Sequence, residues 1–231
     1  LEKPQGLVLL SGPEGSGKST TIYAMLRRMI QPDREIFTLE DPVKYPLMGT
    51  TQIEFNRKAG TTLAGSLRLL LKQDPDVVYL KDIRDAEAAA LAVQTALTSR
   101  LFLSTIQSPD ATGVITRLAE MGVERFPVAS ALSVSISQRL TRTICPSCRE
   151  PYEPAESVLA SLGLESMSGG RFFRGTGCPS CRNTGYKGQP ALFEVRLNDN
   201  GIRNLASPDM QSVFNPSCIR TCRQREKLPS S

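Results

Sequence analysis

The stretch from Gly12 to Ser19 constrains this chain more than any other part of its sequence. It reads Gly-Pro-Glu-Gly-Ser-Gly-Lys-Ser, which matches the P-loop pattern of a glycine, four variable residues and Gly-Lys-Ser/Thr. An apolar run at residues 6–10 precedes it, and a segment with helical apolar spacing follows until Pro32. A strand, a glycine-rich loop and a helix in this order predict a phosphate site, rather than a turn that binds nothing.

Each residue type in this loop has a physical reason. The glycines let the backbone take positive φ angles, so that N–H groups point at phosphate oxygens, and the helix start adds its positive dipole end. We expect Lys18 to reach the β- and γ-phosphates of ATP, Ser19 to bind Mg²⁺ and Thr20 to lie near the α-phosphate. The predicted nucleotide-binding residues are Gly12, Pro13, Glu14, Gly15, Ser16, Gly17, Lys18, Ser19 and Thr20.

Buried strands alternate with helices through the first two-thirds of the chain. Apolar runs at residues 36–39, 77–80 and 101–104 join the run before the loop, and residues 85–99 are rich in alanine and leucine, as in a helix. Continuous apolar strands alternating with helices are typical of a parallel sheet that is covered on both faces. The sequence therefore predicts an α/β fold with a mostly parallel sheet.

Acidic residues follow two of these strands. Glu40 and Asp41 come after the second predicted strand, and Asp82 comes after the third. Open α/β sheets bind ligands at the carboxyl ends of their strands, so these acids are candidates to hold Mg²⁺ or to orient an attacking water. The competing interpretation makes such acids helix caps or turn formers, and it suits Asp85 and Asp110 better.

The composition excludes several classes of function. The chain has no histidine, which removes imidazole bases, Ser-His-Asp triads and histidine metal ligands. Its net charge of +5 and 6% aromatic content, without interleaved basic and aromatic residues, argue against the alternative of a nucleic-acid motor. No run approaches the roughly 20 apolar residues of a membrane span, and the N-terminus does not resemble a signal peptide. We therefore expect a cytoplasmic protein without direct membrane insertion; the missing initiator methionine favours a fragment.

The cysteines predict a metal site. Two C-x-x-C pairs, 29 residues apart, hold four of the six cysteines: Cys145, Cys148, Cys178 and Cys181. Four thiolates close a tetrahedron around Zn²⁺ and leave no open catalytic position, so a structural zinc is expected. Redox disulfides are the alternative, which a reducing cytosol disfavours. Cys218 and Cys222 receive no role.

Changes in residue composition and apolar periodicity divide the chain into three predicted parts. Residues 1–144 form the P-loop core, and residues 145–190 form a four-cysteine zinc-binding insertion with a short helix near residues 155–162. Residues 191–231 contain a return strand and a polar, proline-interrupted tail, which we expect to be poorly ordered.

Several linked motifs between Gly6 and Val195 resemble the C-terminal ATPase domain of the type II secretion and type IV pilus assembly ATPases. The order of the motifs carries the resemblance more than any one of them does. They are the P-loop at 12–19, the Asp box Thr38-Leu-Glu-Asp-Pro-Val-Lys-Tyr45, the Walker B stretch at 71–85, the His box at 103–110, and the match through 111–148 into the cysteine insertion.

This resemblance implies a RecA-like P-loop NTPase core that works as a homo-hexameric ring. It also implies inner-membrane platform proteins as partners, a cytoplasmic place at the inner membrane, and ATP turnover that drives the assembly of pilins or pseudopilins. The expected function is a motor domain for type II secretion or type IV pilus assembly. The alternative is a catalytically degenerate nucleotide-binding subunit or fragment, with a regulatory or structural role in the same machine.

Four positions differ from the residues usual in that family. Its Walker B stretch usually ends Gly-Glu-Ile-Arg-Asp, whereas this chain has Lys81 and Asp82; Gln107 replaces the histidine of the His box, and Lys44 replaces an acid. Exchanging Glu for Asp withdraws a carboxylate by about 1.5 Å, and a misplacement near 1 Å costs about 100-fold in rate. The binding loop is whole, so we expect ATP binding to survive and hydrolysis to be slow or absent.

Overall fold

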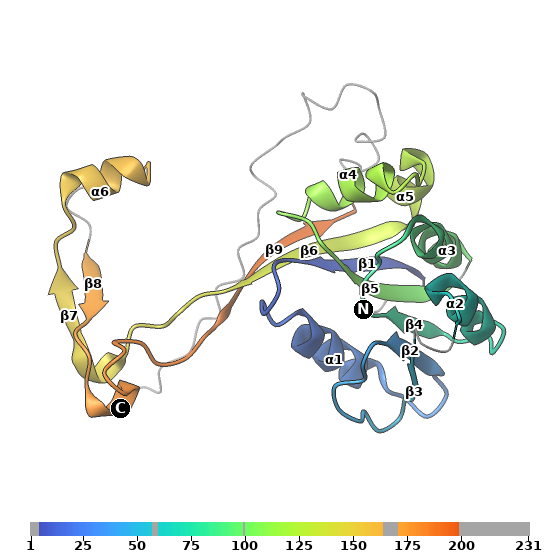
Figure 1. Cartoon of the computed structure of the whole chain (residues 1–231), viewed down its shortest axis with the longest axis horizontal. Helices are drawn as coiled ribbons and strands as arrows, with labels where there is room; N and C mark the ends of the chain where they lie inside the picture. Colours follow the sequence, from blue (N-terminus) through green and yellow to red (C-terminus); the bar gives the residue numbers. More distant parts are fainter. Residues whose placement is uncertain (1–4, 57–59, 99, 164–170, 199–231) are drawn as a thin grey trace. The chain divides into compact units, whose positions relative to one another are not determined.

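The structure, a computed structural model, describes residues 5–56, 60–98, 100–163 and 171–198. These residues form two compact units. The first unit contains the described residues up to Arg139 and those from Leu192 onward, and the second contains residues 140–191 (Figure 1).

The first unit is built on a seven-stranded sheet of order β3-β2-β4-β5-β1-β6-β9. Strand β1 pairs in parallel with β5 and β6, β2 pairs in parallel with β3 and β4, and β4 with β5. Backbone hydrogen bonds from Asn198 to Ser133 and from Thr141 to Pro190 show that β9 runs antiparallel to β6. The strands are β1 (Gly6–Ser11), β2 (Ile36–Glu40), β3 (Thr51–Glu54), β4 (Val77–Leu80), β5 (Leu101–Ile106), β6 (Leu132–Leu140) and β9 (Ala191–Leu197).

Helices cover both faces of this sheet (Figure 1). Successive strand residues point to opposite faces, so Val8 and Leu10 of β1 pack with α1, while Leu7 and Leu9 pack in the cluster formed by the other helices. Strands β1, β4 and β5 are buried along their whole length as a result. The helices are α1 (Lys18–Met29) on one face and α2 (Leu63–Leu71), α3 (Ala86–Leu97), α4 (Gly113–Glu120) and α5 (Arg125–Ala131) on the other.

The prediction of an α/β fold with a mostly parallel sheet is confirmed. The four predicted strands are β1, β2, β4 and β5, and the predicted helix at 85–99 is α3. Its N-cap is Asp85, whose side chain accepts a hydrogen bond from the backbone N–H of Ala88 at 2.8 Å. Asp110 accepts from the backbone N–H groups of Thr112 at 2.9 Å and Gly113 at 2.6 Å, in the turn before α4, whose N-cap is Thr112. Asp85 is thus a helix cap and Asp110 a turn former, the two roles that the competing interpretation offered.

The second unit contains an antiparallel pair, β7 (Arg149–Tyr152) with β8 (Phe172–Gly175), and the short helix α6 (Glu156–Ser161). Two 3₁₀ turns, η2 (Pro146–Cys148) and η4 (Pro179–Cys181), each end on a cysteine. Proline at the start of each turn fixes φ and suits a tight knuckle. The helix predicted near residues 155–162 is α6.

Part of the sequence-based prediction concerns residues outside the described ranges. The predicted tail from residue 199 onward, with Cys218 and Cys222, belongs to this part. None of the helices that the structure describes combines the length and apolar character of a membrane span.

Candidate functional site

The candidate site is the loop between β1 and α1. Gly12, Gly15 and Gly17 have φ angles of 136°, 74° and 85°, a region that favours glycine. Space constrains Gly12 as well: a Cβ atom there would lie 2.2 Å from the backbone oxygen of Gln138 and 3.0 Å from the Oγ of Ser16. The loop therefore needs glycine at position 12 for both its conformation and its packing.

Lys18 lies over this loop. Its Nζ donates hydrogen bonds to the backbone oxygens of Gly12 at 2.7 Å and Pro13 at 2.8 Å. Partial burial lowers the pKa of Lys18, and the carboxylates of Asp82 and Glu14 oppose that shift. The fold thus brings the predicted phosphate-binding lysine and the predicted acid Asp82, 64 positions apart in the sequence, into one electrostatic environment.

A buried glutamine on β6 fixes the loop and the helix start to each other. Gln138 is 2% exposed; its Nε2 donates to the backbone oxygen of Ser16 at 2.7 Å, and its Oε1 accepts from the Oγ1 of Thr21 at 2.8 Å. Sequence reasoning assigned Gln138 no role. The signals there were its place in the family match through residues 111–148 and a polar residue at the end of a segment of alternating serines and apolar residues.

Glu40 lies at the end of β2 and is almost completely buried. One of its oxygens accepts from the hydroxyl of Tyr23 at 2.5 Å, and the other accepts from Thr38 at 2.8 Å and from Gln52 at 3.2 Å. Three donors compensate the desolvation of this carboxylate, which would otherwise be too costly to bury. The sequence predicted the acid but not its donors, which come from α1, β2 and β3.

Lys81 joins the loops that follow β2 and β4. Its Nζ donates to the backbone oxygens of Asp41 at 2.8 Å and Pro42 at 2.9 Å. Partial burial lowers the pKa of Lys81, while the nearby Glu40 raises it. The ammonium group therefore holds the Asp41–Pro42 segment against the end of β4.

Asp82 follows Lys81 with a left-handed backbone, φ 67°, a conformation that aspartate tolerates better than most residues. Its carboxylate accepts a hydrogen bond from the Nε of Arg84 at 2.8 Å and forms an ion pair with it. The Asp82 side chain keeps 18% of its exposure, so water reaches this carboxylate while Glu40 is sealed. Arg84 was not predicted as part of the site.

Gln107 follows β5 and lies beside the loop. It lines a hollow of about 480 Å³ together with Gly12, Pro13, Glu14, Ser108, Pro109 and Arg139. Arg139 donates to the backbone oxygen of Pro109 at 3.1 Å and so borders this hollow from β6. The structure therefore brings Gln107 to the same end of the sheet as the loop.

The four cysteines of the two C-x-x-C pairs converge in the second unit. Their Sγ atoms all lie within 4.8 Å of one another, and the four residues are free thiols. The Sγ–Sγ distances are 3.9 Å for Cys145–Cys178, 3.9 Å for Cys148–Cys181 and 3.7 Å for Cys178–Cys181. A disulfide requires about 2.05 Å. A tetrahedron with metal–sulfur bonds of about 2.3 Å has edges of about 3.8 Å, which the observed distances fit.

Backbone donors support thiolate character at Cys181. The N–H groups of Cys178 and Gly185 point at its Sγ, at 3.2 Å and 3.3 Å. Burial raises the pKa of Cys181, but these donors and the neighbouring thiols outweigh it and lower the pKa to about 6. The four cysteines therefore offer a closed set of soft ligands for a metal ion.

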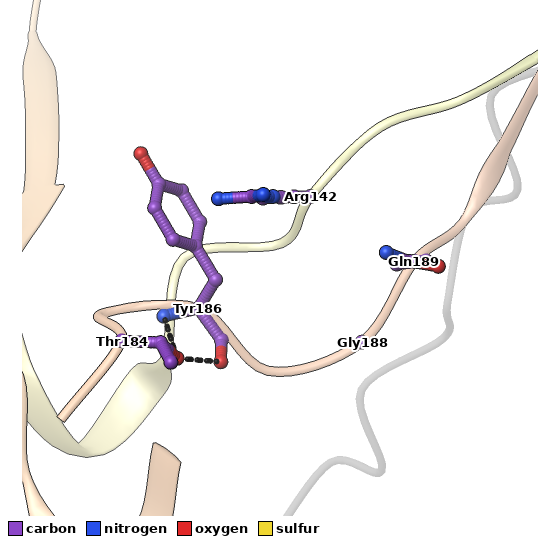
Figure 2. A pocket seen from close by; sticks show the side chains of 5 residues that line it. All are labelled: Arg142, Thr184, Tyr186, Gly188 and Gln189. Carbon is purple, nitrogen blue, oxygen red and sulfur yellow. Dashed lines mark hydrogen bonds between the residues drawn. The ribbon is translucent and has the colours of Figure 1, made fainter. Parts of the chain in front are cut away.

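A second hollow, of about 390 Å³, lies elsewhere in this unit (Figure 2). Arg142 extends over the ring of Tyr186, with its guanidinium carbon 5.3 Å from the ring centroid. The Thr184 hydroxyl donates to the backbone oxygen of Tyr186 and accepts from its N–H. The hollow is lined by Arg142, Thr184, Tyr186, Gly188 and Gln189. All five residues are exposed, so the hollow lacks the buried polar groups that a ligand-binding site uses.

Sequence comparison gives one family and close relatives. The chain matches the family described as "Type II/IV secretion system protein" over residues 1–227. It is 43% identical over 203 residues to the type II secretion system protein E of Aeromonas hydrophila, covering 88% of this chain and 40% of that protein. It is also 43% identical over 206 residues to the type IV pilus assembly ATPase PilB of Thermus thermophilus, covering 88% of this chain and 23% of that protein. The chain thus spans less than half the length of these relatives.

Structure comparison gives the same kind of protein. The pilus retraction motor PilT with bound ADP superposes with a TM-score of 0.63 at 26% sequence identity, covering 87% of this chain and 50% of that one. The prediction of a P-loop NTPase core is confirmed by this likeness.

Proposed function

Because this chain belongs to the family of type II/IV secretion system proteins, we propose that it is the nucleotide-binding part of a motor that uses ATP to drive protein secretion or pilus assembly. The observation that carries the proposal is the loop geometry: three glycines with positive φ, Lys18 over the loop, and α1 beginning directly behind it. The names of the relatives, a secretion protein and a pilus assembly ATPase, support the same motor role.

Binding follows from the loop itself. The backbone N–H groups of residues 14–20 and the positive end of α1 would hold the phosphates, and Lys18 would exchange its bonds to Gly12 and Pro13 for phosphate oxygens. Ser19 lies in the first turn of α1, where a P-loop serine supplies a hydroxyl ligand for Mg²⁺. Bound Mg²⁺ would supply neutralisation of phosphate charge at this position.

Hydrolysis is proposed to be slow. Water reaches the Asp82 carboxylate, and this carboxylate is engaged in an ion pair with Arg84. Glu40 is committed to three donors, which suits a fixed electrostatic role better than proton transfer. Gln107 offers hydrogen bonds at the edge of the loop but no titratable group.

A second candidate function has a specific observation in its favour. The ion pair with Arg84 engages the Asp82 carboxylate, a group that a hydrolytic site would use, and Lys81 holds the backbone oxygens of Asp41 and Pro42 beside it. A subunit that binds ATP without turnover, with a regulatory or structural role in the same machine, fits these contacts. Phosphate release in the presence of bound ATP separates the two functions.

The cysteine cluster is proposed to hold a structural Zn²⁺. Three of its Sγ–Sγ distances match the edge of a zinc–thiolate tetrahedron, and four sulfurs leave no further ligand position to fill. Such a site would stabilise the second unit, whose described residues contain one small sheet, the β7–β8 pair.

The assembly is proposed by analogy with the relatives. A homo-hexamer at the cytoplasmic face of the inner membrane, docked on platform proteins of the secretion or pilus machine, is the arrangement that the family resemblance implies. Mass measurement of a longer chain with ATP would test the hexamer, and a monomer under all nucleotide conditions would refute it.

The first test is direct binding of ATP to the chain. Isothermal titration with ATP and Mg²⁺ should show one site, and Lys18→Ala should weaken binding by about 100-fold, as expected for removal of a charged phosphate contact. Lys72→Ala is the matched control, because Lys72 is an exposed lysine that ends α2 and should bind normally. Absence of ATP binding by the unaltered chain would refute the proposed function.

A further inference from the structure

A tyrosine hydroxyl is buried below the start of α1 without a hydrogen-bond partner among the described residues. It belongs to Tyr79 on β4, whose side chain is fully buried. An unsatisfied hydroxyl in the interior is costly, and phenylalanine would fill the same space without that cost. A buried polar group of this kind calls for a functional explanation.

Polar groups surround this hydroxyl from several elements. Burial raises the pKa of Tyr79, and Glu40, Tyr23 and Asp82 raise it further, whereas the Ser19 hydroxyl lowers it as a donor that lies near the Tyr79 oxygen but outside full hydrogen-bond geometry. The Tyr23 ring meets the Tyr79 ring edge to face, with centroids 6.5 Å apart and planes at 84°. The Tyr79 hydroxyl is therefore neutral and lies within reach of the first turns of α1.

The side chains of α1 near Tyr79 leave one candidate partner for its hydroxyl. Ser19 and Tyr23 are four residues apart on α1, so they lie on the same face of the helix. The Tyr23 hydroxyl already donates to Glu40 at 2.5 Å. Of the two α1 side chains in this row, Ser19 is the one left to pair with Tyr79.

We propose that Tyr79 is a positioning residue for Ser19, and that its phenol oxygen accepts the Ser19 O–H when the serine oxygen turns toward Mg²⁺. This inference rests on the proposed function of the loop. A hydroxyl that gives a lone pair to Mg²⁺ becomes a better proton donor, and a neutral acceptor behind it fixes its direction. The same bond gives the Tyr79 oxygen a donor.

The test is Tyr79→Phe in the full 231-residue chain, which removes only the hydroxyl. The affinity for ATP is measured by titration with Mg²⁺ and again with EDTA. With Mg²⁺ the variant should bind about fivefold more weakly, which equals about 1 kcal/mol, the size of one neutral hydrogen bond. With EDTA it should bind as the unaltered chain does. Tyr45→Phe is the control, since Tyr45 also packs on Tyr23 but is 47% exposed.

Two further measurements separate positioning from a structural role. The thermal midpoint of the nucleotide-free Tyr79→Phe variant should be unchanged or higher, because the removed hydroxyl makes no hydrogen bond of full geometry in the absence of nucleotide. In a Ser19→Ala background, Tyr79→Phe should have no additional effect on ATP affinity, since its action passes through Ser19.

An equal dependence on Mg²⁺ in the unaltered chain and in Tyr79→Phe would overturn the inference while leaving the proposed function intact. A lower thermal midpoint of the nucleotide-free variant would overturn it as well, by showing a structural partner. Failure of the unaltered chain to bind ATP would refute the proposed function, and the inference with it.

Discussion

Replacement of Gln138 by methionine tests whether β6 positions the phosphate loop. Methionine has a similar length and volume, so the core stays filled while both hydrogen bonds of the side chain are lost. The Ser16 oxygen is left buried without its donor, and Thr21 loses its acceptor. Each lost bond costs about 0.5–1.5 kcal/mol, so we expect a total of about 1–3 kcal/mol in the free energy of unfolding.

The same change should weaken ATP binding by about tenfold. Gln138 fixes the Ser16 carbonyl in the centre of the loop, so its loss allows the phosphate-facing N–H groups to shift, and tenfold corresponds to about 1.4 kcal/mol. The chain has no tryptophan, so unfolding in urea is followed by circular dichroism and binding by titration calorimetry. Gln94→Met on the exposed side of α3 is the matched control and should change neither quantity.

Gln138→Glu and Thr21→Val divide the effect between the two bonds. Glutamate keeps an acceptor for Thr21 but loses the donor to Ser16, and valine removes only the Thr21 bond. We expect Gln138→Glu to impair ATP binding more than Thr21→Val does. Unfolding free energy and ATP affinity of Gln138→Met within error of the unaltered chain would refute the positioning role.

Three more predictions concern other parts of the molecule. Lys81→Gly combined with Asp82→Glu should raise the rate of phosphate release by about tenfold or more, and no increase would count against the proposed impairment. Metal analysis should find about one zinc per chain, and Cys181→Ser should lower that content while ATP binding persists; zinc-free protein with four reduced thiols would contradict the metal site. The N–H of Gly113 lowers the pKa of Asp110, so the stability that its hydrogen bonds give to the turn before α4 is present above the unfolded pKa of about 3.9 and is lost as pH falls through the lower folded value. Asp110→Ala should thus cost about 1 kcal/mol in unfolding free energy at pH 7 and less near pH 3, whereas a pH-independent cost would contradict this cause.

The parts of the site that sequence reasoning reached are local in the chain. The loop, its helix and the acids after β2 and β4 follow from short patterns, because strand ends and glycine turns depend on neighbouring residues. The two C-x-x-C pairs also predicted a four-sulfur cluster from a short pattern, and the fold brings these sulfurs together.

The missed parts depend on contacts between distant segments. Gln138 meets Ser16 across 122 positions, and its segment of alternating serines does not distinguish an inner strand of the sheet from an amphipathic edge. The Tyr23 hydroxyl was unpredictable as a donor to Glu40, because tyrosine at a helical apolar position normally indicates packing alone. Lys81 was identified in the sequence as a charged residue in place of glycine. Its partners are the backbone oxygens of Asp41 and Pro42, which no sequence pattern reveals.

The antiparallel pairing of β6 with β9 has a consequence for how the chain tolerates change. Pairing continues past the sheet, with Thr141 bonded to Pro190 and Thr143 bonded to both Lys187 and Gly188. The chain segments at the beginning and the end of residues 140–191 are therefore hydrogen-bonded to each other. A short turn joining them would leave the register of β9 on β6 unchanged, so this segment is open to exchange, shortening or replacement without rerouting the strands that carry the nucleotide loop.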